Sequence, residues 1–280
     1  MSSASNDAAY CLELAELGNP LFRLSRVFAG EQQELLTAVY AFFASVQFIG
    51  SSIQEEDVAR HKISWWQNEC RPENLAVSNH PVLRELERLR GEAACHDQMR
   101  LILAGAERRL EKVPPSDEST FTALCREIGE PLVDMERSVG GSELSRQSDL
   151  DDLVLRRGLW SLICESFGPK GRGETWWLPM SLLARAGLSR EQLSSNPSDS
   201  ACRELYITVY KYANKNSLDI DISSFNQYVT HLLVLDSLIV KRLNVLSQKA
   251  PAAYPSWVQK TGVSDLVKAW STARKVNRQI

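Results

Sequence analysis

A glycine-rich loop is the first feature of the sequence that could do chemistry. Between Gly168 and Gly173 it places three glycines beside Lys170 and Arg172. The backbone amides of such a loop can hold a phosphate group. The spacing of a P-loop and its terminal Lys-Ser/Thr are missing, however. A plain connector between helices is therefore the favoured interpretation, with phosphate binding as the alternative.

Histidine and cysteine side chains, the other usual carriers of chemistry, are not clustered in the sequence. The six cysteines are widely spaced and form no C-x-x-C pair, which predicts reduced thiols on helix faces and a cytoplasmic location. Cys95 and His96 are adjacent, but no second pair follows at metal-ligand spacing, so we expect no zinc site. His231 lies on an apolar helix and is predicted to be a core residue.

Four acidic residues could supply carboxylates to a metal ion. Glu55, Glu56 and Asp57 follow one another, and Glu165 lies just before the glycine-rich loop. Acids at helix ends are usually solvated. We therefore interpret these four residues as surface or helix-end positions.

Among the elements that must position these residues, the most distinctive is an uncharged run over residues 35–53. Its large apolar side chains recur at helical steps of three and four residues: Leu36, Val39, Tyr40, Phe43 and Val46. Interspersed polar residues and acidic flanks favour a buried helix over a membrane span, which is the alternative. The buried polar groups need partners, either other side chains or water and ligand in a cavity.

Helical patterns continue through the rest of the sequence, without strand alternation or an internal repeat. Loops are expected at 71–81 and 194–200. Ser116 is expected to cap a helix, and Ser189 with Gln192 forms a capping box. The other expected helices cover residues 13–17, 57–70, 81–89, 99–110, 116–140, 150–167, 201–216, 222–249 and 263–276. The sequence predicts a single all-α domain over residues 1–280, with roughly nine to eleven helices.

Composition and charge limit the possible functions. Of the 280 residues, 44% are hydrophobic and 24% are charged, as in ordinary globular proteins. The net charge of −3 gives no basis for nucleic-acid binding. The basic residues Lys268, Arg274, Lys275 and Arg278 fit a solvated helix end or a contact with an anionic surface or partner. The first residues do not form a secretory signal, so we expect a cytoplasmic protein, with peripheral contact at the inner membrane face as an alternative.

Several segments resemble the squalene/phytoene synthase family, in the family's own order. They are AYC and GNP (9–11 and 18–20), AVYAF (38–42), ISWWQNE (63–69), HPVL (80–83) and WLPMSLLARAGL (177–188). The resemblance is clearest over residues 8–190, and the Trp-Trp and Leu-Pro…Gly-Leu segments are its most specific parts. It implies an isoprenoid-synthase-like helical bundle with a central cavity. Enzymes of this family join two prenyl diphosphates head to head.

The resemblance also locates the residues that would carry this chemistry, and nearly all of them are replaced. The family holds Mg²⁺ with two pairs of aspartates. These pairs fall on Gln47 with Ser51 and on Ser166 with Lys170. A further family aspartate falls on Arg109. The replaced positions that line the expected cavity are Ala44, Gln47, Phe48, Ser51, Ser166, Lys170 and Trp177.

Without carboxylates at these positions, the resemblance predicts no cofactor and identifies no catalytic residue. Mg²⁺ is expected only if prenyl transfer is retained. We therefore expect a catalytically degenerate member that binds an apolar, isoprenoid-like ligand or a protein partner. Two alternatives stay open. One is an active, atypical prenyl diphosphate transferase, and the other is a membrane-associated assembly factor, similar to the respiratory complex I assembly-factor branch of this fold.

Overall fold

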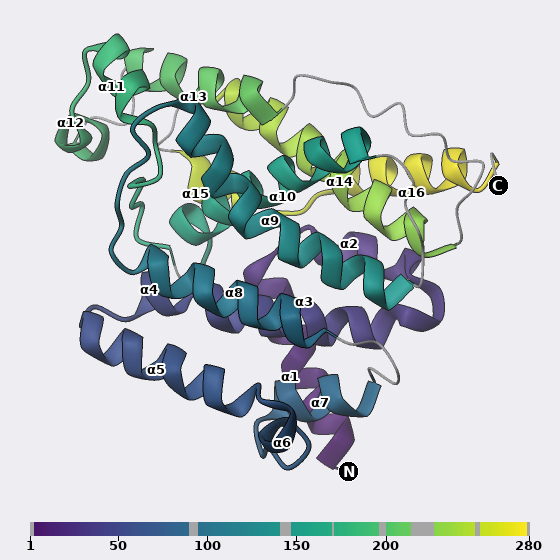
Figure 1. Cartoon of the computed structure of the whole chain (residues 1–280). Helices are drawn as coiled ribbons and strands as arrows, with labels where there is room; N and C mark the ends of the chain where they lie inside the picture. Colours follow the sequence, from purple (N-terminus) through teal and green to yellow (C-terminus); the bar gives the residue numbers. More distant parts are fainter. Residues whose placement is uncertain are drawn as a thin grey trace.

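Every regular element in the described part of the chain is a helix, which confirms the all-α prediction (Figure 1). The computed structural model describes residues 3–89, 95–140, 147–169, 171–195, 200–213, 227–249 and 253–278. The first half contains α1 (Ser3–Gly18), α2 (Phe22–Ser25), the 3₁₀ turns η1 (Arg26–Phe28) and η2 (Gly30–Gln32), α3 (Gln33–Gln47), α4 (Ile49–Ser52), α5 (Glu56–Glu69), α6 (Pro72–Leu75), α7 (Pro81–Leu89) and α8 (His96–Arg109). The second half contains α9 (Glu118–Gly140), α10 (Gln147–Phe167), α11 (Met180–Ala186), α12 (Arg190–Ser195), α13 (Ser200–Ala213), α14 (Gln227–Ser247), α15 (Tyr254–Gln259) and α16 (Val263–Val276).

The helices pack in layers around α3 and α10. Helix α3 contacts α1, α7, α8 and α9, and α10 contacts α1, α9, α13, α14 and α15. Figure 1 shows α5 outside α8 at one edge of the bundle and α16 beside α14 at another. Because α3 and α10 both contact α1 and α9, the two helices that carry the family positions meet in the middle of the bundle.

The uncharged run forms two helices rather than the single one expected. Helix α3 is buried over nearly its whole length. Phe48 interrupts it, and α4 ends at Ser52, after which Ile53 is extended. The hydroxyls of Thr37 and Ser45 each donate to the carbonyl one turn earlier at 2.7 Å, which satisfies them within α3. In the ranges that the structure describes, none of the helices combines the length and the apolar character needed to cross a membrane.

Two helix starts and one predicted loop differ from the prediction. Helix α1 starts at Ser3 and is longer than expected. The predicted loop at 71–81 contains α6, because Pro72 takes a first-turn position that suits proline. Asp117 rather than Ser116 caps α9, since the Thr120 N–H donates to Asp117 Oδ1 at 2.9 Å. This bond and its neighbours lower the pKa of Asp117 to about 2.

Other predicted helix boundaries agree with the structure. The predicted capping box forms: the Ser189 N–H donates to Gln192 Oε1 at 2.7 Å, and the Gln192 N–H donates to Ser189 Oγ at 3.1 Å. Helix α16 covers the predicted range. Parts of the segments predicted at 194–200, 201–216 and 222–249 lie outside the described residues.

Three of the segments that resemble the family pack against one another. The Trp66 ring, which is 2% exposed, lies 5.6 Å from the Phe42 ring and 4.7 Å from the His80 ring, centroid to centroid. Trp65, beside it, is 43% exposed. The Trp-Trp pair therefore has one buried and one half-exposed ring, as its place on a surface helix predicts.

Helices α9 and α10 approach so closely that their backbones touch at two glycines. A Cβ on Gly158 would lie 1.9 Å from the carbonyl oxygen of Cys125. A Cβ on Gly129 would lie 2.1 Å from the carbonyl oxygen of Val154. Neither gap admits a side chain, because the obstructing atoms belong to backbone that cannot rotate away. These glycines therefore set the spacing of the two long helices α9 and α10.

Substituting Gly158 tests this close approach. Gly158→Ala should lower the free energy of unfolding by about 3 kcal/mol or more, since α10 must move away from α9. Gly50→Ala is the matched control: its new Cβ would meet Leu110 at an ordinary 3.4 Å, so stability should stay the same or rise slightly. Urea unfolding followed by circular dichroism measures both. Equal effects of the two substitutions would contradict the interpretation.

Candidate functional site

A small cavity lies where α1, α3, α9 and α10 meet. Its volume is about 10 Å³, enough for about one water molecule. Ala44, at the family's arginine position, lines this cavity with Gly18, whose added Cβ would lie only 2.4 Å from that of Ala44. The crossing of α1 and α3 therefore leaves no room for a side chain at position 18. The other lining residues are Asn19, Tyr40, Phe43, Leu132, Arg157, Trp160 and Ser161.

One wall of this cavity belongs to a buried charged network centred on Glu136. The carboxylate of Glu136 accepts a hydrogen bond from the Tyr40 hydroxyl. It also lies 3.6 Å from Arg157 Nε and 3.9 Å from His231 Nε2. The side chains of Glu136, Arg157 and His231 are at most 1% exposed. His231 also packs edge-on against Phe22, so the predicted core histidine joins α14 to the network.

Burial and charge act in opposite directions on the pKa values in this network. Burial by itself disfavours the ionised form of Glu136, but the Arg157 charge and the hydrogen bonds from His231 and Tyr40 outweigh it and lower the pKa. Burial and the Glu136 charge raise the pKa of Tyr40 well above its usual value. Tyr40 is therefore a neutral donor near pH 7 rather than a base or nucleophile.

A second buried ion pair joins α10 to α14. Arg156 Nε donates to Asp236 Oδ1 at 2.8 Å, and the two side chains are 1% and 0% exposed. Burial raises the pKa of Asp236, although the positive charges of Arg156 and Arg157 oppose that shift. The sequence did not predict this pair, because Arg156 and Asp236 lie 80 positions apart.

The Arg156–Asp236 pair predicts a strongly non-additive double-mutant cycle. Arg156→Met alone should destabilise the protein by about 3–5 kcal/mol, because it leaves the Asp236 carboxylate buried without its main counter-charge. Adding Asp236→Leu should recover most of that loss, since no unpaired charge remains. Urea unfolding of the parent, both single variants and the double variant measures the coupling. If the losses in the free energy of unfolding of the two single variants add up in the double variant, the contact between Arg156 and Asp236 is not the important interaction of these residues.

The residues at the aspartate positions make hydrogen bonds inside the protein. The Gln47 side-chain amide donates to the Ser161 carbonyl at 2.8 Å, which links α3 to α10. The Ser51 hydroxyl donates to the Phe48 carbonyl at 3.4 Å, within the same stretch of chain. The Ser166 hydroxyl donates to the Glu174 carbonyl at 2.6 Å. These positions are buried, and Lys170 lies outside the described residues.

The segment around Trp177 closes the end of α10. Trp177 is 1% exposed, and its Nε1–H donates to the Ser166 hydroxyl at 2.8 Å. Nearby, Arg172 Nη2 donates to the Ser52 carbonyl at 3.0 Å, and Lys112 pairs with Glu174. In the described part of the glycine-rich loop, the residues therefore fasten α10 to α4 and to the end of α8. That arrangement agrees with the connector interpretation.

Sequence reasoning was wrong about Glu165. It was expected at the surface, but it is half-buried and one carboxylate oxygen is shielded from solvent. Burial raises its pKa, while the nearby Arg109 charge and a hydrogen bond from Gln47 oppose the rise. Arg109 is itself 9% exposed and lies 3.8 Å from Glu127. The one signal in the sequence that pointed to Glu165 was the position of this residue directly before Ser166.

A substitution at Glu165 should change how stability depends on pH. Because burial raises the pKa of this carboxyl, the folded protein keeps the proton to a higher pH than the unfolded chain does, and ionisation costs stability. Glu165→Gln removes that cost. The variant's stability relative to the parent should therefore increase as the pH rises from about 4 to about 7.

Urea unfolding across this pH range measures the effect, with Glu130→Gln, at an exposed acid on α9, as the matched control. A stability difference that does not change with pH would contradict the burial of a titrating carboxyl at this position.

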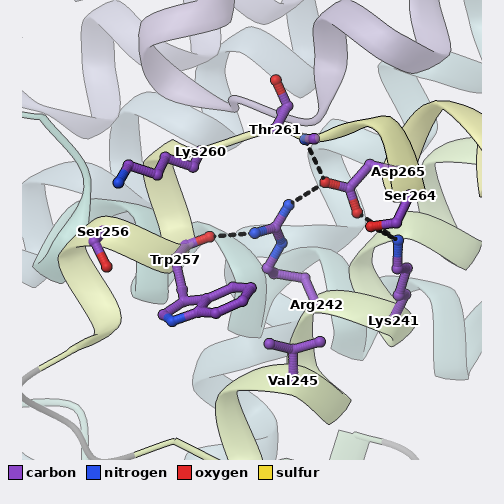
Figure 2. A pocket seen from close by; sticks show the side chains of 10 residues that line it. Lys241, Arg242, Val245, Ser256, Trp257, Lys260, Thr261, Ser264 and Asp265 are labelled. Carbon is purple, nitrogen blue, oxygen red and sulfur yellow. Dashed lines mark hydrogen bonds and ion pairs between the residues drawn. The ribbon is translucent and has the colours of Figure 1, made fainter.

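A larger cavity lies near the C-terminus, among α14, α15 and α16 (Figure 2). Its volume is about 400 Å³. Asp265 accepts from Lys241 at 2.8 Å, from Arg242 at 2.7 Å and from the Gly262 N–H at 3.0 Å. Burial disfavours the Asp265 anion, but these partners outweigh it and lower its pKa. The charges that line the cavity are thus largely used to fix the first turn of α16.

The described side chains give little support for a metal site or for a nucleophilic cysteine. Among them, no three His, Cys, Asp or Glu residues group closely enough to hold a metal ion. All six cysteines are free. Burial raises the pKa of Cys11 and of Cys70 to about 12, so neither is a ready nucleophile near neutral pH.

Comparisons with known proteins agree with the helical architecture. The squalene/phytoene synthase family model matches residues 18–216. A crystal structure of a dehydrosqualene synthase in complex with ligand superposes with a TM-score of 0.71 at 12% sequence identity, covering 99% of this chain and 98% of that chain. No curated protein matches this chain.

The bundle is thus a helical protein with the isoprenoid synthase fold. The chain belongs to the squalene/phytoene synthase family, which confirms the resemblance drawn from its motif segments.

Proposed function

We propose that the chain is a family member that has lost prenyl transfer and acts by binding a partner. The supporting observation is that Gln47, Ser51 and Ser166 stand at the aspartate positions and use their side chains in internal hydrogen bonds. Ionising a prenyl diphosphate depends on metal ions, which stabilise the leaving group by several kcal/mol. A protein without metal ligands at these positions lacks that contribution.

The side chains at these positions do not fit Mg²⁺. Magnesium prefers carboxylate oxygens and water in octahedral geometry. Ser166 is already hydrogen-bonded to Trp177 and Glu174. The carboxylate of Glu165, next to Ser166, lies beside the Arg109 cation, which would repel a divalent ion. We therefore assign no step of a reaction to Mg²⁺ in this chain.

Of the two kinds of partner, a protein fits better than an apolar ligand. Ligand pockets usually measure about 300–1,000 Å³. Among the described residues, the cavity between α1, α3, α9 and α10 measures about 10 Å³, and its wall includes the charged Arg157. The cavity among α14, α15 and α16 measures about 400 Å³, but the charged Lys241, Arg242 and Asp265 line it. The dehydrosqualene synthase neighbour was solved with a ligand, so an isoprenoid-like ligand is the alternative. A protein partner would make this chain comparable to the assembly-factor branch of the fold.

We also infer a reducing, cytoplasmic location. Six free cysteines, most of them buried, support a compartment where thiols stay reduced. Because the buried thiols pack within the core, oxidation would disrupt it.

Incubation with farnesyl diphosphate or geranylgeranyl diphosphate and Mg²⁺ tests the loss of prenyl transfer. We expect no release of pyrophosphate above that of a heat-denatured sample, because the carboxylates that would bind the metal are missing. A dehydrosqualene synthase serves as the positive control in the same assay. Release above background would rescue the alternative of an active, atypical transferase.

Native mass spectrometry of the purified protein then separates the two kinds of partner. The mass of the polypeptide alone is expected. A retained lipid of isoprenoid mass would instead favour the apolar ligand.

A further inference from the structure

The charge of the chain is distributed very unevenly. Residues 241–278 contain eight lysines and arginines and a single acid, Asp265, whereas the whole chain carries a net charge of −3. That acid is used inside the protein, where it pairs with Lys241 and Arg242. The surface formed by α15 and α16 is therefore strongly basic on an otherwise acidic protein.

Helix α16 exposes a row of large apolar side chains on this basic surface. Val263, Leu266, Val267 and Trp270 are 77%, 54%, 60% and 58% exposed, respectively. They occupy positions i, i+3, i+4 and i+7 and so form one stripe along the helix, here called the α16 ridge. Asp265, Ala269, Ala273 and Val276 are the buried residues of α16. The ridge is therefore not needed to hold α16 in the fold.

Arg274 continues the ridge one turn beyond Trp270, and two lysines lie further round the helix on the side of Val267. Lys268 and Lys275 are seven residues apart and so lie on the same side of the helix. The Arg274 guanidinium lies 5.2 Å from the centre of the Trp270 ring. Both lysines and Arg274 are exposed. The outer surface of α16 thus combines an apolar stripe with cations and has no exposed acid.

The start of α16 is held rigidly. Asp265 accepts from the Gly262 N–H, Lys241 and Arg242, and these contacts tie the first turn to α14 (Figure 2). A fixed helix presents the ridge without a cost for ordering it on binding.

We propose that the α16 ridge docks on the surface of an anionic phospholipid bilayer. The apolar side chains enter the headgroup region, Trp270 lies at the interface that tryptophan prefers, and the flanking cations contact lipid phosphates. A second copy of the chain fits less well, because pairing two such surfaces brings like charges together. The docking does not depend on whether prenyl transfer is lost, so its failure and that of the proposed function are separate outcomes.

Co-sedimentation of the full chain with lipid vesicles tests the proposal. Vesicles of phosphatidylcholine with phosphatidylserine should bind the protein at least tenfold more tightly than phosphatidylcholine alone, and high salt should abolish the difference. Lys268→Gln with Lys275→Gln should weaken binding about 20-fold. Leu266→Ser with Trp270→Ser should weaken it at least tenfold, because it removes most of the inserted apolar area.

Leu101→Ser is the matched control, since Leu101 is 55% exposed on α8, away from the ridge. It should bind like the parent. Brominated lipids should also quench tryptophan fluorescence in the parent more than in Trp270→Phe.

Three results would overturn the proposal. The first is equal binding to both kinds of vesicle, and the second is full binding by the Leu266→Ser/Trp270→Ser variant. The third is a dimer in solution that these two substitutions dissociate, which would identify the ridge as a contact between two copies of the chain.

Discussion

The buried carboxylate of Glu136 is the constraint on which the centre of the protein depends. It accepts from Tyr40 of α3 and lies within 4 Å of Arg157 of α10 and His231 of α14. A buried charge costs several kcal/mol unless such partners compensate it. Three helices must therefore bring polar groups to α9. These contacts hold the middle of the bundle together.

That constraint bears directly on function. Among the described residues, the cavity between these helices measures about 10 Å³. Close to it, Gln47 and Ser166 link α3, α10 and the Trp177 segment by hydrogen bonds. In this region the Arg109 cation lies near the Glu165 carboxyl. Arg109 and the internally hydrogen-bonded Gln47 and Ser166 stand where the family resemblance places aspartates, which is the ground for the proposed loss of prenyl transfer.

The chain thus divides its polar residues between two regions with different consequences. In the centre, charges are paired inside the protein and serve stability. At the C-terminal end, Asp265 pairs with two cations to anchor α16, and the remaining cations stay exposed beside the ridge. A binding surface needs exposed groups, whereas buried polar groups form their hydrogen bonds and ion pairs inside the protein. This contrast is why the outer surface of α16, rather than the centre of the bundle, is proposed as a docking surface.

The sequence alone determined the features that depend on neighbouring residues. Helical periodicity and the Ser189–Gln192 capping box follow from local patterns, and the motif segments identified the family. The replacement of the family's aspartates stays a prediction from that resemblance. Burial of Glu165, the Arg156–Asp236 pair and the size of the cavity came only from the tertiary structure. These depend on which distant helices meet. The free energy of a charge is set by the groups that surround it, and in a helical bundle those groups come from elements far apart in the chain.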